Sequence, residues 1–199
     1  MDNNIQVGVQ TNGSDGSKIV ARGGRQGDSI VSELHGRYYE QTFRENMFSV
    51  ANQAVVTTST SLNTTFTGLS VANPAGSGYN LVINKFTCGQ VAVGAASAVG
   101  VSVGAGAAAG SLTIRNRKYG GRASVAVASA SATISAPILI ALAGSVGSLA
   151  TTGYGLMKAL ELDFEGSLVI QPGYFVASDT TIATTSALIF GFCWEEVPL

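Results

Sequence analysis

Polar and apolar side chains alternate along most of the chain from Ser49 onward, and this period of two constrains the fold more than any other feature. In "ASASATISA" (128–136), Ser or Thr fills every second position and Ala or Ile fills the positions between. The run "KALELDFEG" (158–166) alternates Leu and Phe with Glu and Asp. Successive side chains of a β-strand point to opposite faces of the sheet, whereas a helix scatters such a pattern around its axis. The alternation therefore predicts half-buried strands.

Further runs of strand character are separated by turn residues, and they lie at 52–60, 79–88, 91–104, 111–118, 137–144, 174–178 and 186–194. About eight short strands joined by turns predict one all-β domain, an antiparallel sandwich or barrel, because βαβ units would need helical stretches between the strands. A chain of 199 residues is long enough for one such domain with a sizeable core.

Two stretches rich in Pro and Gly are predicted to reverse the chain between strands. The first, "NPAGSGYN" (73–80), has the glycines of a phosphate-binding loop, but Tyr79 stands where such a loop needs lysine, and a strand follows. The second is "QPGY" (171–174), whose Pro-Gly pair separates two strand-like runs. Both stretches are therefore expected to be turns and not binding loops.

The stretch from Val91 to Gly110 combines strand periodicity with many Gly, Ala and Ser residues. Small side chains bury little apolar area, and each glycine within a strand weakens its ladder. The stability of this stretch is expected to depend on close approach by a neighbour, which in a homo-oligomer can be another subunit near a symmetry axis.

Residues 1–47 differ from the rest and predict an extended N-terminal arm in front of a domain at 48–199. Loop-type sequences such as "NGSDGS" and "RGGRQGD" fill its first part. The segment "SELHGRYYEQTFRENMF" (32–48) adds aromatic and charged residues, and Gly36 interrupts the helical pattern that starts at Ser32. We therefore expect an extended segment whose aromatic side chains anchor it on a partner.

Charged residues make up 12% of the chain, and the formal net charge is -1. A nucleic-acid-binding domain usually has a basic excess, so no nucleic-acid partner is expected. The uncharged span 123–157 is rich in Ala, Ser, Gly and Thr and contains Pro137, so it predicts buried strand and no membrane-spanning helix. Residues 1–18 lack the positive and apolar regions of a secretory leader, and none is expected.

Few residues of catalytic type stand out, and each has a simpler structural interpretation. His35 is the only histidine, so it is expected to be an arm contact or a solvated residue and not part of a multi-histidine metal site. Glu161, Asp163 and Glu165 share one strand face and offer oxygen ligands to calcium, but an acidic stripe facing water on an edge strand is favoured. The sequence thus predicts no metal, no cofactor and no enzymatic activity.

The basic cluster "RNRKYGGR" (115–122) is predicted to be a hairpin turn that displays its charge to water. Contact with nucleic acid or acidic glycans, and pairing with the acidic stripe of another subunit, are the alternatives. Cys88 and Cys193 lie in apolar strand-like contexts, and free thiols are favoured over a disulfide between them.

Four stretches carry a resemblance to a known group of proteins: "SELHGRYYEQTFRENMFSVANQ" (32–53), "FTGLSVANPAGSGYNLVINKF" (66–86), "LELDFEGSLVIQPGYFVAS" (160–178) and "FGFCWEEVPL" (190–199). They resemble the jelly-roll virion proteins of tailed bacteriophages, which include trimeric cement or decoration proteins of the capsid and small head and tail appendages. The resemblance covers roughly half of the chain and lies in turns and strand starts.

The resemblance implies an antiparallel jelly-roll sandwich that closes as a homotrimer, with the arm reaching over neighbouring subunits of the major capsid protein. The expected function is that of a non-enzymatic cement protein, assembled in the host cytoplasm, which stabilises the capsid exterior through several weak arms at once. Aromatic and Arg side chains dominate interface energetics. The expected arm contacts are therefore Arg37, Tyr38, Tyr39, Phe43, Arg44 and Phe48. The alternative is a fibre or spike module that binds a host surface glycan.

Overall fold

The computed structural model describes residues 5–6, 21–22, 36–58, 65–92, 96–106, 110–133, 137–147 and 159–199. The chain divides into two compact units, Met1–Tyr39 and Glu40–Leu199. The predicted boundary after residue 47 thus differs from the observed one, because most of helix α1 (Tyr39–Phe43) belongs to the second unit. The ammonium of Lys118 donates to the carbonyl of Phe43 (3.3 Å) and to the carboxylate of Glu45 (2.8 Å), which joins this segment to the β-domain.

The first unit contains two short strands, β1 (Ile5–Gln6) and β2 (Ala21–Arg22), which pair in parallel. The prediction of an extended segment is wrong for α1, which begins with a hydrogen bond from the Tyr39 N–H to the Gly36 carbonyl (2.9 Å). No helix within the described ranges is long and apolar enough to cross a lipid bilayer.

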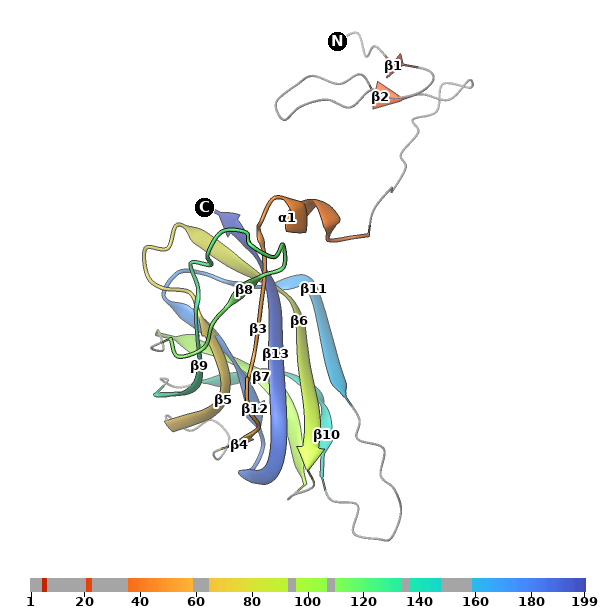
Figure 1. Cartoon of the computed structure of the whole chain (residues 1–199). Helices are drawn as coiled ribbons and strands as arrows, with labels where there is room; N and C mark the ends of the chain where they lie inside the picture. Colours follow the sequence, from red (N-terminus) through yellow and green to blue (C-terminus); the bar gives the residue numbers. More distant parts are fainter. Residues whose placement is uncertain are drawn as a thin grey trace. The chain divides into compact units, whose positions relative to one another are not determined.

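The second unit is an all-β sandwich, as the alternation predicted, with two antiparallel sheets that pack face to face (Figure 1). The six-stranded sheet has the order β11-β6-β13-β3-β8, with β4 also paired to β13, and the five-stranded sheet has the order β10-β7-β12-β5-β9. The strands are β3 (Met47–Ala51), β4 (Val56–Thr58), β5 (Thr65–Ala72), β6 (Tyr79–Ala92), β7 (Ser97–Ala105), β8 (Arg115–Asn116), β9 (Val127–Thr133), β10 (Ile138–Val146), β11 (Leu160–Ile170), β12 (Tyr174–Thr180) and β13 (Thr184–Pro198).

The core lies between the sheets and is built asymmetrically. The six-stranded sheet contributes its aromatic rings, Phe48, Phe86, Phe190, Phe192 and Trp194, whereas the five-stranded sheet contributes mainly Leu and Val. The Phe86 ring lies 6.0 Å from that of Phe190 and 5.0 Å from that of Phe192, between ring centroids. Large rings bury the most apolar surface per residue, so one layer supplies most of the hydrophobic stabilisation.

Both predicted turns are confirmed, and they meet at one end of the sandwich. Gly173 adopts a φ of 88°, a left-handed conformation that favours glycine, where the chain passes from β11 in one sheet to β12 in the other. The Gly173 N–H donates to the carbonyl of Asn73 (2.7 Å), and the Asn73 amide donates to the carbonyls of Tyr79 (2.8 Å) and Ile170 (3.0 Å). Buried Asn73 therefore stabilises the first turn through its side chain and is hydrogen-bonded to the second turn through its backbone carbonyl.

The Gly- and Ala-rich stretch was expected to need a close neighbour. At Gly100 that neighbour is strand β10 of the same chain. This residue lies on β7, and a Cβ atom there would sit 2.4 Å from the carbonyl oxygen of Ala141 on β10. The β10 ladder is irregular at this point, with a register shift between Leu139 and Ala141. A bulge thus presses the β10 backbone onto β7, so no second subunit is needed to explain the glycine at this position.

Candidate functional site

The residues predicted to anchor the arm are divided between the two units. Arg37, Tyr38 and Tyr39 belong to the first, with the Arg37 guanidinium 5.3 Å from the Tyr38 ring centroid. Phe43 and Arg44 belong to the second. Tyr39 is 45% exposed and Phe43 is 59% exposed. His35 lies outside the described residues.

Phe48 is a core residue, and its prediction as an arm anchor is wrong. Its side chain is fully buried on β3 and stacks on Trp194 with 6.2 Å between ring centroids. Burial of such a side chain stabilises a domain by about 1.5–3 kcal/mol. Exposing it to a partner would forfeit that contribution, so Phe48 belongs to the sandwich.

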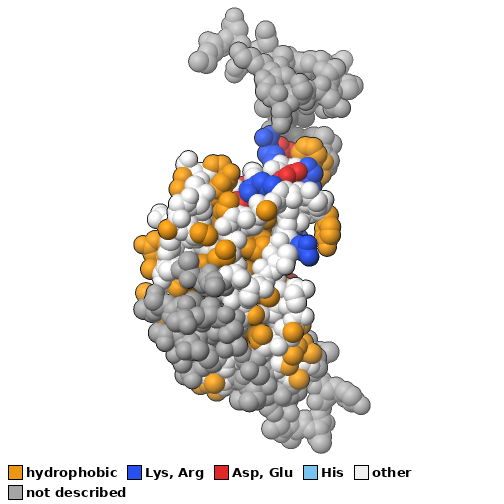
Figure 2. Space-filling view, turned by 60° about the vertical axis from the view of Figure 1, so that its left-hand side comes forward, with side chains coloured by type: hydrophobic (Ala, Val, Ile, Leu, Met, Phe, Trp, Pro, Cys, Tyr) orange, Lys and Arg blue, Asp and Glu red, His pale blue; other side chains and the backbone are white. Residues whose placement is uncertain are grey.

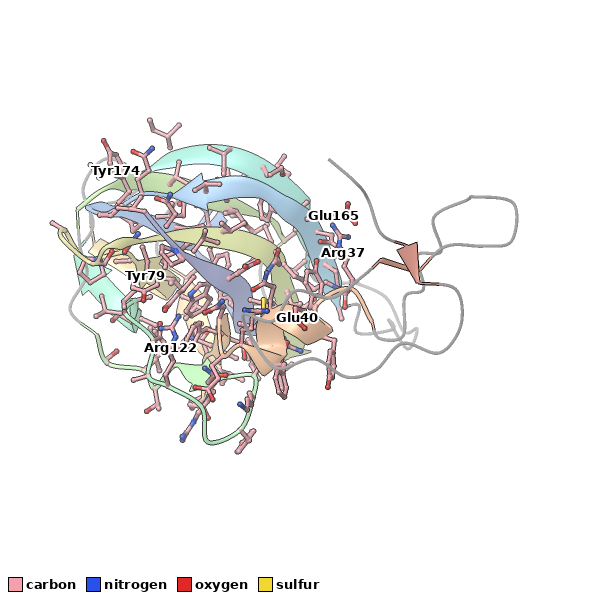
Figure 3. The ribbon with its side chains drawn as sticks, turned by 90° about the horizontal axis from the view of Figure 1, so that it is seen from above. Arg37, Glu40, Tyr79, Arg122, Glu165 and Tyr174 are labelled. Atoms are coloured by element: carbon pink, nitrogen blue, oxygen red, sulfur yellow. The ribbon has the colours of Figure 1, made fainter. Side chains whose placement is uncertain are left out.

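The prediction that the basic cluster displays its charge to water is wrong for Arg122. Its guanidinium donates to the carboxylate of Glu196 (2.7 Å), which is fully buried. It also lies 4.8 Å from the ring centroid of Phe48 and 5.2 Å from that of Tyr79, and Figure 3 shows Arg122 next to Tyr79. The same carboxylate accepts hydrogen bonds from the Ser124 hydroxyl and the Val125 N–H. A buried charge of this kind is tolerated because it is paired and hydrogen-bonded.

Glu45 joins the end of α1 to the loop that contains this arginine. One carboxylate oxygen accepts from the Lys118 ammonium (2.8 Å) and the other from the Arg122 N–H (2.9 Å). These hydrogen bonds, led by the one from Lys118, lower the pKa of the Glu45 carboxyl. Figure 2 shows Lys, Arg, Asp and Glu side chains gathered at the α1 end of the face it presents. Part of the basic cluster thus forms hydrogen bonds and ion pairs within the domain.

The strands β10 and β11 form the edges of the two sheets at one open side of the sandwich. Gly144 of β10 faces Leu160 of β11 so closely that a Cβ atom at position 144 would lie 3.0 Å from the Leu160 side chain. A groove of about 520 Å³ lies at this side, lined mainly by apolar residues that include Val103, Ile138, Leu168, Ile170 and Tyr174.

Three of the exposed side chains of β10 are aliphatic. Ile138 is 64% exposed, Ile140 43% and Leu142 57%, and the strand contains no charged residue. This edge strand therefore lacks the charged side chains with which natural proteins often protect a sheet edge.

The acidic stripe lies on β11, as the alternation predicted. Glu161, Asp163 and Glu165 are exposed, and the Glu161 carboxylate accepts a hydrogen bond from the Lys85 ammonium (3.2 Å). Among the residues that the structure describes, no group of three or more His, Cys, Asp or Glu side chains is placed to hold a metal ion.

The two cysteines are free thiols on opposite faces of the six-stranded sheet. Cys88 lies in the core, where burial raises its thiol pKa to about 12. Cys193 lies on the outer face, where the Arg117 guanidinium donates to its sulfur (3.3 Å). Burial also raises the pKa of Cys193, and the nearby Arg117 opposes that shift.

A second groove lies on this outer face. Its volume is about 340 Å³, and its polar side chains include Ser49, Lys85, Thr87, Thr113, Arg115 and Arg117. Gly191 lies in its floor next to Thr87. We call this site the outer groove. No local stretch of sequence predicts this groove, because Lys85 is distant along the chain from the basic cluster.

No protein family, no curated protein and no solved structure matches this chain.

Proposed function

We propose that the chain is a virion structural protein of the jelly-roll class, a cement or decoration subunit that assembles as a homotrimer and binds the exterior of a phage capsid. The observation that carries this proposal is the uncharged edge strand β10, with three exposed aliphatic side chains. The neighbouring copy in the trimer would cover this strand, so that the exposed apolar edge of the isolated subunit becomes an interface.

The strand pairing supports the jelly-roll part of the proposal. β3 pairs with β13, β5 with β12, β6 with β11 and β7 with β10, so these pairs are nested along the chain. Nested antiparallel pairs divided between two sheets are expected when a long hairpin rolls up, and jelly rolls are double-sheet folds found in capsid and lectin domains. On this interpretation, β8 and β9 belong to an insertion between β7 and β10.

The segment from Arg37 to Arg44, which contains α1, is proposed to be the part of the arm that contacts the major capsid protein. Tyr39 and Phe43 are exposed aromatic residues of α1, and Arg37 and Arg44 flank them. An arm on each of three subunits would bind together, so the avidity for a capsid lattice exceeds the affinity of one arm. The Arg44 guanidinium already pairs with Glu40 (2.6 Å), an exposed ion pair that a capsid carboxylate can replace at little cost.

The test combines light scattering after size-exclusion chromatography with sedimentation on capsids that lack the protein. We expect the full chain to be a trimer that binds these capsids, and the double variant Tyr39→Ala, Phe43→Ala to be a trimer that binds them much more weakly. The control is Tyr119→Ala, which removes an aromatic residue that is 92% exposed but outside α1. A monomeric full chain, or a double variant that binds as well as the control, would contradict the proposal.

The alternative proposal is a fibre or spike module that recognises a glycan. The outer groove favours it, because a sheet-face groove lined by hydroxyl groups and cations is suited to a polar ligand.

A further inference from the structure

We infer that the outer groove is a binding site for an acidic saccharide, a sugar that carries carboxylate or sulfate groups. The groove lies over β3, β6, β8 and β13 on the face of the six-stranded sheet that points away from the core. Its volume of about 340 Å³ is at the lower end of the range for small-ligand pockets, roughly 300–1,000 Å³. A short saccharide is therefore the appropriate size of ligand.

Three cations converge on the groove, and Arg115 is available to a ligand. Within the described part of the chain, no hydrogen bond or ion pair engages the Arg115 side chain. Arg117 uses one guanidinium nitrogen for the Cys193 sulfur, a weak acceptor, and retains other donors. Lys85 pairs with Glu161, but both side chains are exposed, by 41% and 60%, so a bound anion can displace this carboxylate at little cost.

The remaining lining is suited to sugar hydroxyl groups. Ser49, Thr87 and Thr113 present hydroxyls that can both donate and accept, which matches the hydrogen-bonding capacity of a sugar. The floor is low because position 191 is glycine, and a Cβ atom there would lie 2.7 Å from the Thr87 hydroxyl oxygen. The cations would recognise the acidic group, and the hydroxyls would orient the ring.

An acidic peptide fits this site less well than a saccharide. Peptides that bind sheets usually add a strand to an exposed edge, where main-chain hydrogen bonds provide affinity. β6 and β13 lie inside the sheet and are paired on both sides, so their backbone groups are already used, whereas β3 pairs with the short strand β8 only at Phe48 and Ser49. Over β6 and β13 the groove therefore offers side chains only, which is the kind of contact that a saccharide with many hydroxyls can use.

The experiment is isothermal titration of the full chain with digalacturonate, compared with its neutral dimethyl ester and with inorganic sulfate. We expect digalacturonate to bind, the ester to bind at least about tenfold more weakly, and sulfate to bind more weakly than digalacturonate, since hydrogen bonds to charged groups contribute strongly. Equal binding of the ester would overturn the role of the cations. Equal binding of sulfate, or of a short poly-glutamate peptide, would overturn the assignment to saccharides.

Three variants locate the site. Arg115→Ala is expected to weaken digalacturonate binding about tenfold, whereas Arg44→Ala, the matched loss of an exposed arginine outside the groove, leaves it unchanged. Glu161→Gln removes the carboxylate that competes for Lys85, so it is expected to tighten binding a few-fold, which loss of folding cannot imitate. An affinity that is equal in all three variants would place the ligand elsewhere and overturn the inference.

Cys193 supplies an independent signal from inside the groove. Bound digalacturonate is expected to slow the reaction of the Cys193 thiol with a disulfide reagent, whereas Cys88 is buried in the core and stays unreactive. An unchanged rate at saturating ligand would contradict the site. These measurements require neither a trimer nor a capsid, so their failure is distinguishable from failure of the cement proposal.

Discussion

The edge strands β10 and β11 lie at the same open side of the sandwich but present opposite chemistry. β11 exposes Glu161, Asp163 and Glu165, whereas β10 exposes Ile138 and Leu142 and has no charge. Both ladders contain register shifts, so bulges do not distinguish them. Charge distinguishes the two edges, because a charged edge discourages pairing with another chain and an apolar edge permits it. One sheet edge is thus protected by charge and the other is not.

The largest expected effect is a loss of stability when the buried ion pair of Arg122 and Glu196 is broken. The exposed charges of β11 are expected to contribute much less to the free energy of unfolding. Arg122→Ala leaves the Glu196 carboxylate buried without its cation and is expected to lower the free energy of unfolding by about 3 kcal/mol, measured by urea denaturation. Glu161→Gln, which breaks the exposed pair with Lys85, is expected to change it by less than about 1 kcal/mol. Similar losses in the two variants would show that the β11 edge stabilises the fold.

The second effect tests the β10 edge directly. Ile140→Lys places a charge on a side chain that is 43% exposed, so the monomer is expected to fold, while the trimer weakens on the order of 100-fold because a desolvated, unpaired charge opposes association. Light scattering over a dilution series measures this change. The control is Val55→Lys, an exposed valine outside this edge, and equal weakening in both variants would remove β10 from the interface.

A third, smaller effect concerns the protected edge. Neutralising β11 with Glu161→Gln and Asp163→Asn is expected to promote self-association at high protein concentration, because its backbone edge loses the charges that oppose pairing. The free energy of unfolding should change by less than about 1 kcal/mol. Turbidity and urea denaturation separate the two quantities, and an unaltered tendency to aggregate would mean that the acidic stripe does not protect the edge.

The smallest effect is that of pH. The pKa of Glu45 is lowered from its ordinary 4.5, chiefly by the hydrogen bond from Lys118, so its stabilising contribution is complete above that value and is lost as pH falls through the folded-state pKa. β10 contains no titratable side chain, so association through it should not follow this titration. Carboxyl NMR resonances of Glu45 report the first event and light scattering reports the second. A trimer that dissociates in step with Glu45 would tie assembly to the α1 junction instead.

Local pattern was sufficient to predict most of the strands and both turns. The alternation over 158–166 placed Glu161 and Asp163 on one face because a strand has a fixed period of two, and that face is exposed. The Pro172-Gly173 turn followed from residue chemistry alone. The alternation did not predict β3 and β5, which only the family resemblance covered. Gly68 in β5 and the short apolar run at 47–51 in β3 give a weak periodic signal.

The failed predictions concern residues whose environment comes from distant parts of the chain. Phe48 is adjacent to an exposed aromatic segment in sequence, yet its burial is provided by Trp194 across the β3–β13 ladder. In the sequence, Arg122 is part of a basic turn. In the structure, its guanidinium pairs with the carboxylate of Glu196 on β13. No window of local sequence contains both partners, so periodicity cannot distinguish a core aromatic or a buried ion pair from an exposed one.

The sequence by itself determined an all-β domain, its main turns and the acidic stripe, because these depend on side-chain period and on residues that favour turns. The acidic stripe also predicted an edge strand at 161–165, but only the tertiary structure decided that β10 is an edge, since strand order depends on pairing between segments far apart in the chain. That order makes β10 an exposed apolar edge, and it brings Lys85, Arg115 and Arg117 together in the outer groove. The two sheet surfaces that are proposed to bind partners therefore arise from how the sheets are assembled.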